Sequence, residues 1–276
     1  METMLPTTFC GGISLIALWK WPGLRLARIT GSLAQMTLCG FAMAMFAFSV
    51  ARLNRPLVDG SLLVFDHSLG YQWDAFTSFV VSRPALESFL ATAYNSMFWQ
   101  PIVVIVALSF DRDERKLNRY ITSYVLSMLF TIAIFALWPA TTAWSYLGIS
   151  AVEISRHHLQ ATMEWVNALN LTRSGVPIFA SSHTSCAIVG FPSFHSVSGI
   201  INASVMGRSR YLRMPFLIVN AIMIAATPIL GGHYIADIIG AVFVTVAALA
   251  LSDLIFVDDR EGERLIHVGN LKSYLV

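Results

Sequence analysis

Two short motifs hold the histidines whose surroundings are best suited to chemistry: GFPSFHS at residues 190–196 and GGHYIAD at residues 231–237. In the second motif His233 and Asp237 are four residues apart, so on a helix their side chains share a face. A carboxylate beside an imidazole fixes its tautomer and raises its basicity, which leaves the other ring nitrogen free to attack. The spacing therefore predicts a nucleophilic or acid–base histidine at this position.

The residues around both histidines favour an anionic substrate. Gly231 and Gly232 carry no side chains, so a bulky anion can approach the helix that is expected to begin there. The first turn of a helix presents free N–H groups, which suit phosphate. Pro192 and Ser193 give a similar start to a second helix, with His195 in its first turn. We expect Gly232 and Ser193 to contribute to a phosphate site, although helix capping explains Ser193 equally well.

The composition indicates that these motifs belong to a membrane protein. Of 276 residues, 56% are hydrophobic and only 12% are charged, and the mean hydropathy is +0.65. A soluble domain normally has about a quarter charged residues. The net charge of +2 is too small to indicate a nucleic-acid partner, and Lys and Arg occur in short clusters between apolar runs. The lipid bilayer is the partner that this composition predicts.

The apolar runs predict an all-α bundle of six transmembrane helices in a single domain, residues 1–276. One of the six is short and rich in small residues, which let helices approach closely, so we expect it to be a buried central helix. Residues 9–19 are left unassigned, as a surface or re-entrant element. The expected spans are about 31–51, 92–110, 120–138, 193–207, 211–229 and 233–257, the fourth being the short one.

The distribution of basic residues predicts the orientation. With both termini in the cytoplasm, most of the 18 basic residues fall inside, as the positive-inside rule requires. Both histidine motifs then lie at the outer end of the bundle. The two long outer segments are 52–91, where we expect short interfacial helices, and 139–192. Residues 152–169 of the latter have helical spacing, and either a membrane-surface helix or a helix packed over the bundle would explain them.

The two motifs resemble signature blocks of the type 2 phosphatidic acid phosphatase superfamily, whose usual forms are P-S-G-H and S-R-x5-H-x3-D. Residues 192–195 match the first of these with Phe for Gly, and His233 with Asp237 matches the end of the second. The wording F-P-S-F-H-S and G-G-H-Y-x-x-D, together with Trp-Pro-Ala at 138–140, is closer to the branch of inositol phosphorylceramide synthases and their bacterial relatives. The resemblance covers roughly residues 90–250.

This resemblance implies a role for each motif residue. His233 would be the nucleophile that forms a phosphohistidine, and Asp237 would orient it. His195 would protonate the leaving oxygen and then activate water or an acceptor alcohol. The superfamily needs no metal or other cofactor, and the sequence offers no cluster with metal-ligand spacing. The implied fold is the six-helix bundle expected above.

The chain departs from the family pattern where the phosphate should meet positive charge. Ala226-Thr227 stands in place of Ser-Arg, and no K-x6-R-P block follows the third span. Phosphoryl transfer needs positive charge on the equatorial oxygens, so an Arg or Lys elsewhere must complete the site. Our first candidate is Arg173 in the outer loop before the fourth span. The second is Arg156, which precedes two histidines.

The function that we expect is hydrolysis of a lipid phosphate ester or diphosphate by an integral, multi-pass membrane protein, in the inner membrane if the source is a bacterium. A phosphotransferase that passes the group to a lipid or polyol hydroxyl is the alternative, and a non-catalytic phospholipid-binding protein is a third. A proton-relaying transporter is disfavoured because the spans are nearly free of charge at their centres. The lipid, the acceptor and the oligomeric state stay open.

Overall fold

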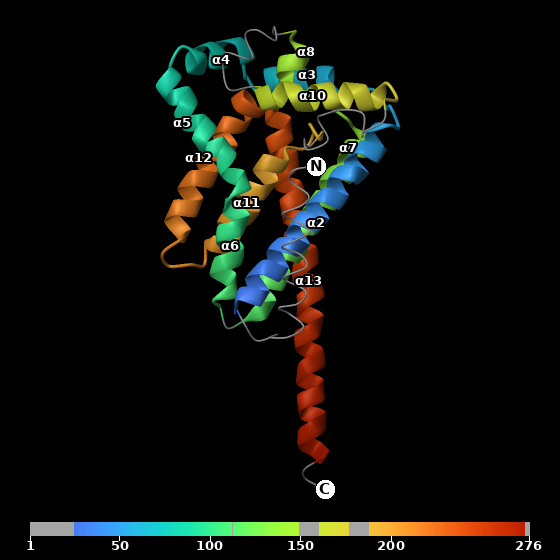
Figure 1. Ribbon diagram of the computed structural model, residues 1–276, viewed down its shortest axis with the longest axis vertical. Helices are drawn as coiled ribbons and strands as arrows, with labels where there is room; N and C mark the ends of the chain where they lie inside the picture. Colours follow the sequence, from blue (N-terminus) through green and yellow to red (C-terminus); the bar gives the residue numbers. More distant parts are fainter. Residues whose placement is uncertain (1–24, 112, 149–159, 177–187, 274–276) are drawn as a thin grey trace.

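The chain folds as a bundle of helices in a computed structural model that describes residues 25–111, 113–148, 160–176 and 188–273. No strand occurs among these residues (Figure 1). The elements are α2 (Arg25–Ala51), α3 (Asp59–Ser68), α4 (Trp73–Val81), α5 (Pro84–Asn95), the 3-10 turn η1 (Ser96–Phe98), α6 (Gln100–Ser109), α7 (Glu114–Leu137), α8 (Ala143–Tyr146), α10 (Gln160–Arg173), α11 (Phe194–Met206), α12 (Arg213–Gly231) and α13 (Ile235–Ser273).

Four described helices are long and apolar enough to cross a membrane: α2, α7, α12 and the part of α13 from Ile235 to Phe256. A fifth candidate is the pair formed by α5 with η1 and by α6, which is bent by 47°. Such a count indicates an integral multi-pass membrane protein. Six spans were expected, so the described helices yield four or five instead.

The missing sixth span is α11, which has 13 residues. At 1.5 Å per residue it is about 20 Å long, shorter than the roughly 30 Å of a bilayer core. Its central position agrees with the prediction, because it packs against α6, α7, α12 and α13. A Cβ at Gly199 would lie 2.7 Å from Cε of Met223 and 3.1 Å from Oδ1 of Asn220, so any larger residue would require these side chains of α12 to shift.

Helix boundaries differ from the expected ones where polar residues extend a helix. The third span begins at Glu114 rather than near 120, because Asp113 caps α7 by accepting a hydrogen bond from the Arg115 amide. The second begins at Pro84 rather than 92, since proline is favoured in the first turn of a helix. Its break at η1 was not expected.

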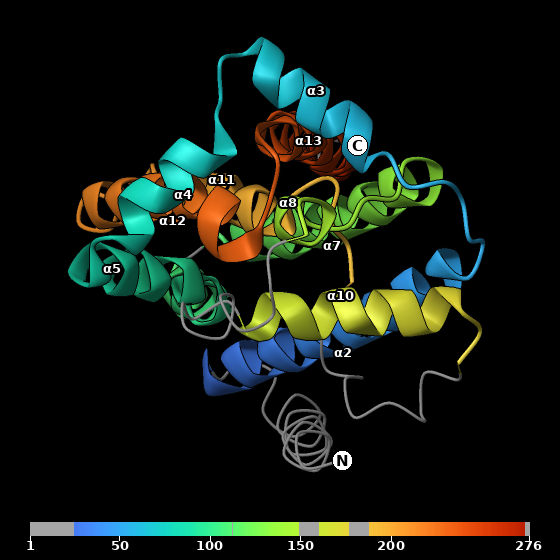
Figure 2. The same cartoon turned by 90° about the horizontal axis from the view of Figure 1, so that it is seen from above.

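The described parts of the two expected outer segments lie at one end of the bundle, the end where α11 and α13 begin (Figures 1 and 2). The first forms α3 and α4 and leads into α5, where the second span begins. In the second, α10 packs over α2 and α7, where Leu169 joins a buried cluster with Phe48 and Phe135. This contact favours the reading of a helix packed over the bundle. Residues 9–19 lie outside the described part of the chain.

Candidate active site

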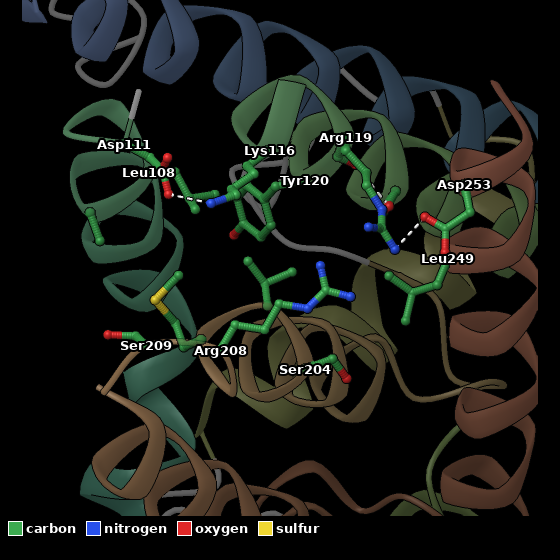
Figure 3. Close-up of a pocket in the computed structure, with 14 residues that line it drawn as sticks. Leu108, Asp111, Lys116, Arg119, Tyr120, Ser204, Arg208, Ser209, Leu249 and Asp253 are labelled. Atoms are coloured by element: carbon green, nitrogen blue, oxygen red, sulfur yellow. Dashed lines mark hydrogen bonds and ion pairs between the residues drawn. The ribbon is translucent and has the colours of Figure 1, made fainter. Parts of the chain in front are cut away.

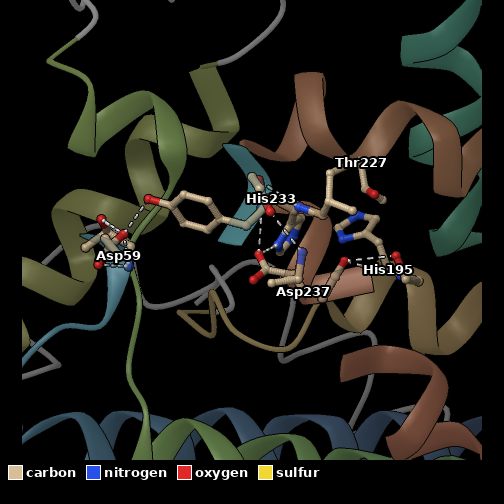
Figure 4. Close-up of polar contacts among 12 residues, drawn as sticks. Asp59, His195, Thr227, His233 and Asp237 are labelled. Atoms are coloured by element: carbon tan, nitrogen blue, oxygen red, sulfur yellow. Dashed lines mark hydrogen bonds and ion pairs between the residues drawn. The ribbon is translucent and has the colours of Figure 1, made fainter. Parts of the chain in front are cut away.

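His233 and Asp237 form a buried pair at the start of α13 (Figure 4). Nδ1 of His233 lies 3.0 Å from Oδ2 of Asp237, and the Tyr234 amide donates to the same oxygen at 3.0 Å. His233 is 5% exposed and Asp237 is fully buried. The carboxylate accepts the Nδ1 proton, so the lone pair of the ring is on Nε2. The arrangement suits a histidine that attacks through Nε2.

The end of α12 fixes where His233 leaves the helix. Pro228 has no N–H for the carbonyl of Ile224, and the Thr227 hydroxyl donates to this carbonyl at 2.7 Å instead. The carbonyl of Thr227 in turn accepts from the amides of Gly232 and His233. Thr227, found where the family pattern has arginine, therefore serves the backbone that positions the histidine.

The two glycines before His233 make room for side chains of the protein itself. A Cβ at Gly231 would lie 2.6 Å from Cδ2 of His233 and 2.8 Å from the hydroxyl of Tyr94. A Cβ at Gly232 would lie 2.4 Å from Cδ1 of Trp144, and this residue also has a φ of +65°. Trp144 therefore lies where a side chain at position 232 would be, and the predicted role of Gly232 in phosphate binding stays a prediction.

The free amides expected at the start of α13 are already occupied. The carboxylate of Asp66, in α3, accepts from the amides of Ile235 at 3.0 Å and Ala236 at 3.2 Å. The indole N–H of Trp73 donates to the same carboxylate at 3.2 Å. Asp66 is fully buried and acts as a helix cap supplied from another element. In this structure these two amides are therefore bound by a carboxylate of the protein itself, and phosphate binding at this helix start stays a prediction.

A second carboxylate of α3 holds the same turn. Asp59 accepts from the amide of Thr141 at 3.0 Å, from its hydroxyl at 2.7 Å, and from the hydroxyl of Tyr234 at 3.0 Å. Burial, followed by the charge of Asp59, raises the pKa of Tyr234, so the phenol stays protonated and donates. Neither acidic residue was predicted to support the site. Their seven-residue separation, two helical turns, is the signal that they share one face.

His195 lies in the first turn of α11 and is held by an aromatic ring. The ring of Tyr94 stacks on it with centroids 4.0 Å apart and planes at 12°. The Tyr94 hydroxyl lies 3.3 Å from Nδ1 of His195, and Phe98 meets the histidine edge-on at 6.4 Å. Nε2 of His195 is buried and has no hydrogen-bond partner among the described residues. The contact of Tyr94 with His195 was not predicted from the sequence; Tyr94 lies just before the bend at η1.

Ser193 caps α11 in the structure. Its hydroxyl accepts from the amide of Ser196 at 3.4 Å, and it is fully buried. Its own amide donates to the carbonyl of Asp237 at 3.2 Å, which links the starts of α11 and α13. Of its two predicted roles, capping is therefore the one with a contact in the structure.

The structure brings the two histidines of the predicted site together. Their ring centroids are 6.3 Å apart and the planes are inclined by 55°. One ring has its Nδ1 bonded to a carboxylate, and the other has a buried, unpartnered Nε2. Nucleophilic attack by one imidazole and proton transfer by the other need such a pair. Among the described residues, no three His, Cys, Asp or Glu side chains form a metal-binding group.

Of the two arginines predicted to bind phosphate, the structure describes Arg173 but not Arg156. Arg173 ends α10, and its Nη2 donates to the carbonyl of Arg55 at 2.9 Å, while Nη1 is buried without a partner. No described contact joins it with His195 or His233. Arg156 lies outside the described residues. Within the described part of the chain, no Lys or Arg is hydrogen-bonded or ion-paired to either histidine.

A comparison with protein families gives one match: the family model described as PAP2 superfamily matches residues 60–251, well over half of the chain. The matched stretch contains α3 from Gly60 onward, both histidines and Asp237. It identifies the superfamily and not a branch within it. Searches of curated proteins and of solved structures give no match.

Proposed function

This chain belongs to the PAP2 superfamily, and from that premise we propose that it is a membrane phosphatase whose nucleophile is His233. Membership of the superfamily suggests an activity of the phosphatase type. The observation that carries the proposal is the pairing of His233 with Asp237 at 3.0 Å, with the His195 ring 6.3 Å away. We propose a lipid phosphate ester or diphosphate as the substrate, because the chain is a multi-pass membrane protein.

In the first step, Nε2 of His233 attacks phosphorus. The new N–P bond forms as the P–O bond to the lipid alcohol breaks, and the leaving oxygen takes a proton from Nε2 of His195. Asp237 retains its hydrogen bond to Nδ1 and stabilises the positive charge that develops on the attacking ring. The product is a phosphohistidine and a free lipid alcohol.

In the second step, His195 acts as a base. Its Nε2 takes a proton from water while the water oxygen attacks phosphorus and the N–P bond breaks, which releases inorganic phosphate and restores both histidines. An alcohol in place of water would give a phosphorylated acceptor by the same chemistry. The acceptor therefore decides between phosphatase and phosphotransferase, and we propose water.

The proposed reaction also needs positive charge beside the equatorial oxygens of the phosphate. Arg173 has a buried Nη1 without a partner, so one donor is available for an anion, although Nη2 is bound to Arg55. Arg156 is the other candidate. We propose that one of the two completes the site once substrate is bound, and that this site is at the outer face of the membrane.

Purified protein in detergent, with EDTA present, tests the proposal against a panel of lipid phosphates. Released phosphate and the lipid products are measured for wild type and for His233→Ala, with and without an alcohol acceptor. We expect metal-independent release of phosphate that the substitution abolishes. A phosphorylated acceptor without free phosphate would establish the transferase instead. Equal activity of the variant would show that His233 is not the nucleophile, and binding of lipid without any product would favour a non-catalytic protein.

A further inference from the structure

The other end of the bundle contains a hollow of about 420 Å³, far from both histidines. It lies between the end of α6, the start of α7, the end of α11 and the middle of α13 (Figure 3). His195 is in the first turn of α11, and the hollow begins at its last turn, with Ser204. A helix of 13 residues is about 20 Å long. One small ligand cannot contact both places, so this hollow is a separate feature.

Three cationic side chains line this hollow, and two of them are paired with carboxylates. Nζ of Lys116 lies 2.7 Å from Oδ2 of Asp111, and Arg119 forms an ion pair with Asp253. The third cation, Arg208, has no hydrogen bond or ion pair with any described residue. Figure 3 shows its guanidinium extending into the hollow and facing the same space as the Arg119–Asp253 pair. The lining therefore has an excess of one positive charge, directed inward.

The remaining residues that line the hollow are apolar side chains and serines. Leu108, Val205 and Leu249 form apolar walls, whereas the hydroxyls of Ser204 and Ser209 add hydrogen-bonding capacity. A guanidinium binds a phosphate through two parallel N–H groups, which a point charge cannot do. Apolar walls beside such a group suit a phosphate that is attached to an acyl chain. The shape and the charge together fit an amphiphilic anion.

We propose that this hollow, centred on Arg208, is an anion site for a phosphate group, carried by an anionic phospholipid of the adjacent leaflet. The positive-inside rule explains why Lys and Arg residues gather at this end of the bundle. It does not explain why the guanidinium of Arg208, a residue that is exposed overall, extends into a hollow that also has apolar walls. Because the site is separate from the histidines, the proposal does not depend on the catalytic activity.

Lipid binding to delipidated protein in detergent tests this site. Native mass spectrometry gives the affinity for phosphatidylglycerol, which is anionic, and for phosphatidylcholine, whose phosphate is neutralised by choline. The variants are Arg208→Gln and Arg210→Gln. Arg210 is an exposed residue of the same loop that contacts the ring of Tyr211 and does not line the hollow, so it is a matched control for surface charge. Inorganic phosphate is added as a competitor in a separate arm.

We expect wild type and Arg210→Gln to bind phosphatidylglycerol alike and better than phosphatidylcholine, and Arg208→Gln to bind it about tenfold more weakly. Competition by millimolar inorganic phosphate would mean that free phosphate also occupies the site; its absence would restrict the ligand to the lipid. Arg208 is exposed, so the thermal stability of the lipid-free variant should equal that of wild type. Equal binding by Arg208→Gln and wild type, or equal losses in the two variants, would overturn the proposal.

Discussion

The two histidines of the candidate site are held by different kinds of contact. On the His233 side, carboxylates do the holding: Asp237 binds the ring, Asp66 caps the helix that follows, and Asp59 binds the hydroxyl of Tyr234. On the His195 side, the contacts are a stacked ring of Tyr94 and a hydrogen bond of 3.3 Å. One nitrogen of this second ring has no partner among the described residues.

This difference matches the two tasks in the proposed reaction. A nucleophile must meet phosphorus along one line, so fixed hydrogen bonds at His233 and along its backbone are an advantage. A group that first gives and then takes a proton changes its charge twice, and a neighbouring carboxylate would oppose one of these changes. Aromatic stacking restrains the position of His195 without placing a carboxylate on its ring.

Replacing Asp237, the carboxylate that binds the ring of His233, should have the largest effect on turnover. In Asp237→Asn the amide can no longer hold the Nδ1 proton in the required tautomer, and we expect turnover to fall on the order of 10³-fold or more. Phosphate release from the best lipid substrate measures it. Thr245→Val is the control on the same helix, since the Thr245 hydroxyl is buried without a partner among the described residues. A loss below about tenfold for Asp237→Asn would contradict the pairing.

Removing the proton donor should have a smaller effect that depends on the leaving group. His195→Ala should lower turnover of an alkyl phosphate about 10²-fold or more. With p-nitrophenyl phosphate the leaving oxygen needs little protonation, so the loss in the first step should be much less. Burst kinetics separate this step from hydrolysis of the intermediate. Equal losses in that step for both leaving groups would exclude His195 as the acid.

Replacing Asp66, the α3 carboxylate that caps α13, should lower the stability of the fold. Asp66→Asn replaces one acceptor oxygen by an NH2 group, which leaves one of the two part-buried amides at the start of α13 without its acceptor, and we expect the free energy of unfolding to fall by about 2 kcal/mol. Thermal unfolding in detergent would show a lower midpoint. His67→Asn, at the exposed neighbouring position, should leave the midpoint unchanged. Equal midpoints for both variants would mean that the cap contributes nothing.

Removing the hydroxyl of Tyr94, beside His195, should have the smallest effect on turnover. Tyr94→Phe retains the stacked ring and removes only the hydroxyl near Nδ1 of His195, so we expect a three- to tenfold lower turnover, as one hydrogen bond of about 1 kcal/mol predicts. The pH profile of turnover should shift, because this hydroxyl contacts the group that titrates. An unchanged profile would show that Tyr94 only fills space. Thermal stability should stay close to that of wild type.

The sequence was sufficient for the features that rest on local spacing. The separation of His233 and Asp237 predicted their contact, and small residues predicted the central position of α11. The bounds of α11 agree with the expected 193–207, but its count as a membrane span does not, because a helix buried by its neighbours need not be long enough to cross the bilayer. The break at η1 could not be predicted from hydropathy, which runs through it.

The contacts that the sequence did not predict are long-range ones to main-chain groups. Asp66 binds amides 169 and 170 residues away, and an amide has no signature in a sequence. The glycines before His233 indicate a close approach, but only the fold shows that the approaching groups are Trp144 and Tyr94. The positive charge that phosphoryl transfer needs is predicted to come from Arg173 or Arg156.

The most direct test of the account is to trap the covalent intermediate. Protein with His195→Ala is mixed with a radiolabelled phosphate ester that has a good leaving group, quenched in alkali and digested, and the labelled peptide is identified by mass spectrometry. We predict one phosphate on His233, stable in alkali and lost in acid, and no label when His233 is also replaced. Label on another residue, or turnover of substrate by the double variant, would contradict the assignment of His233 as the nucleophile.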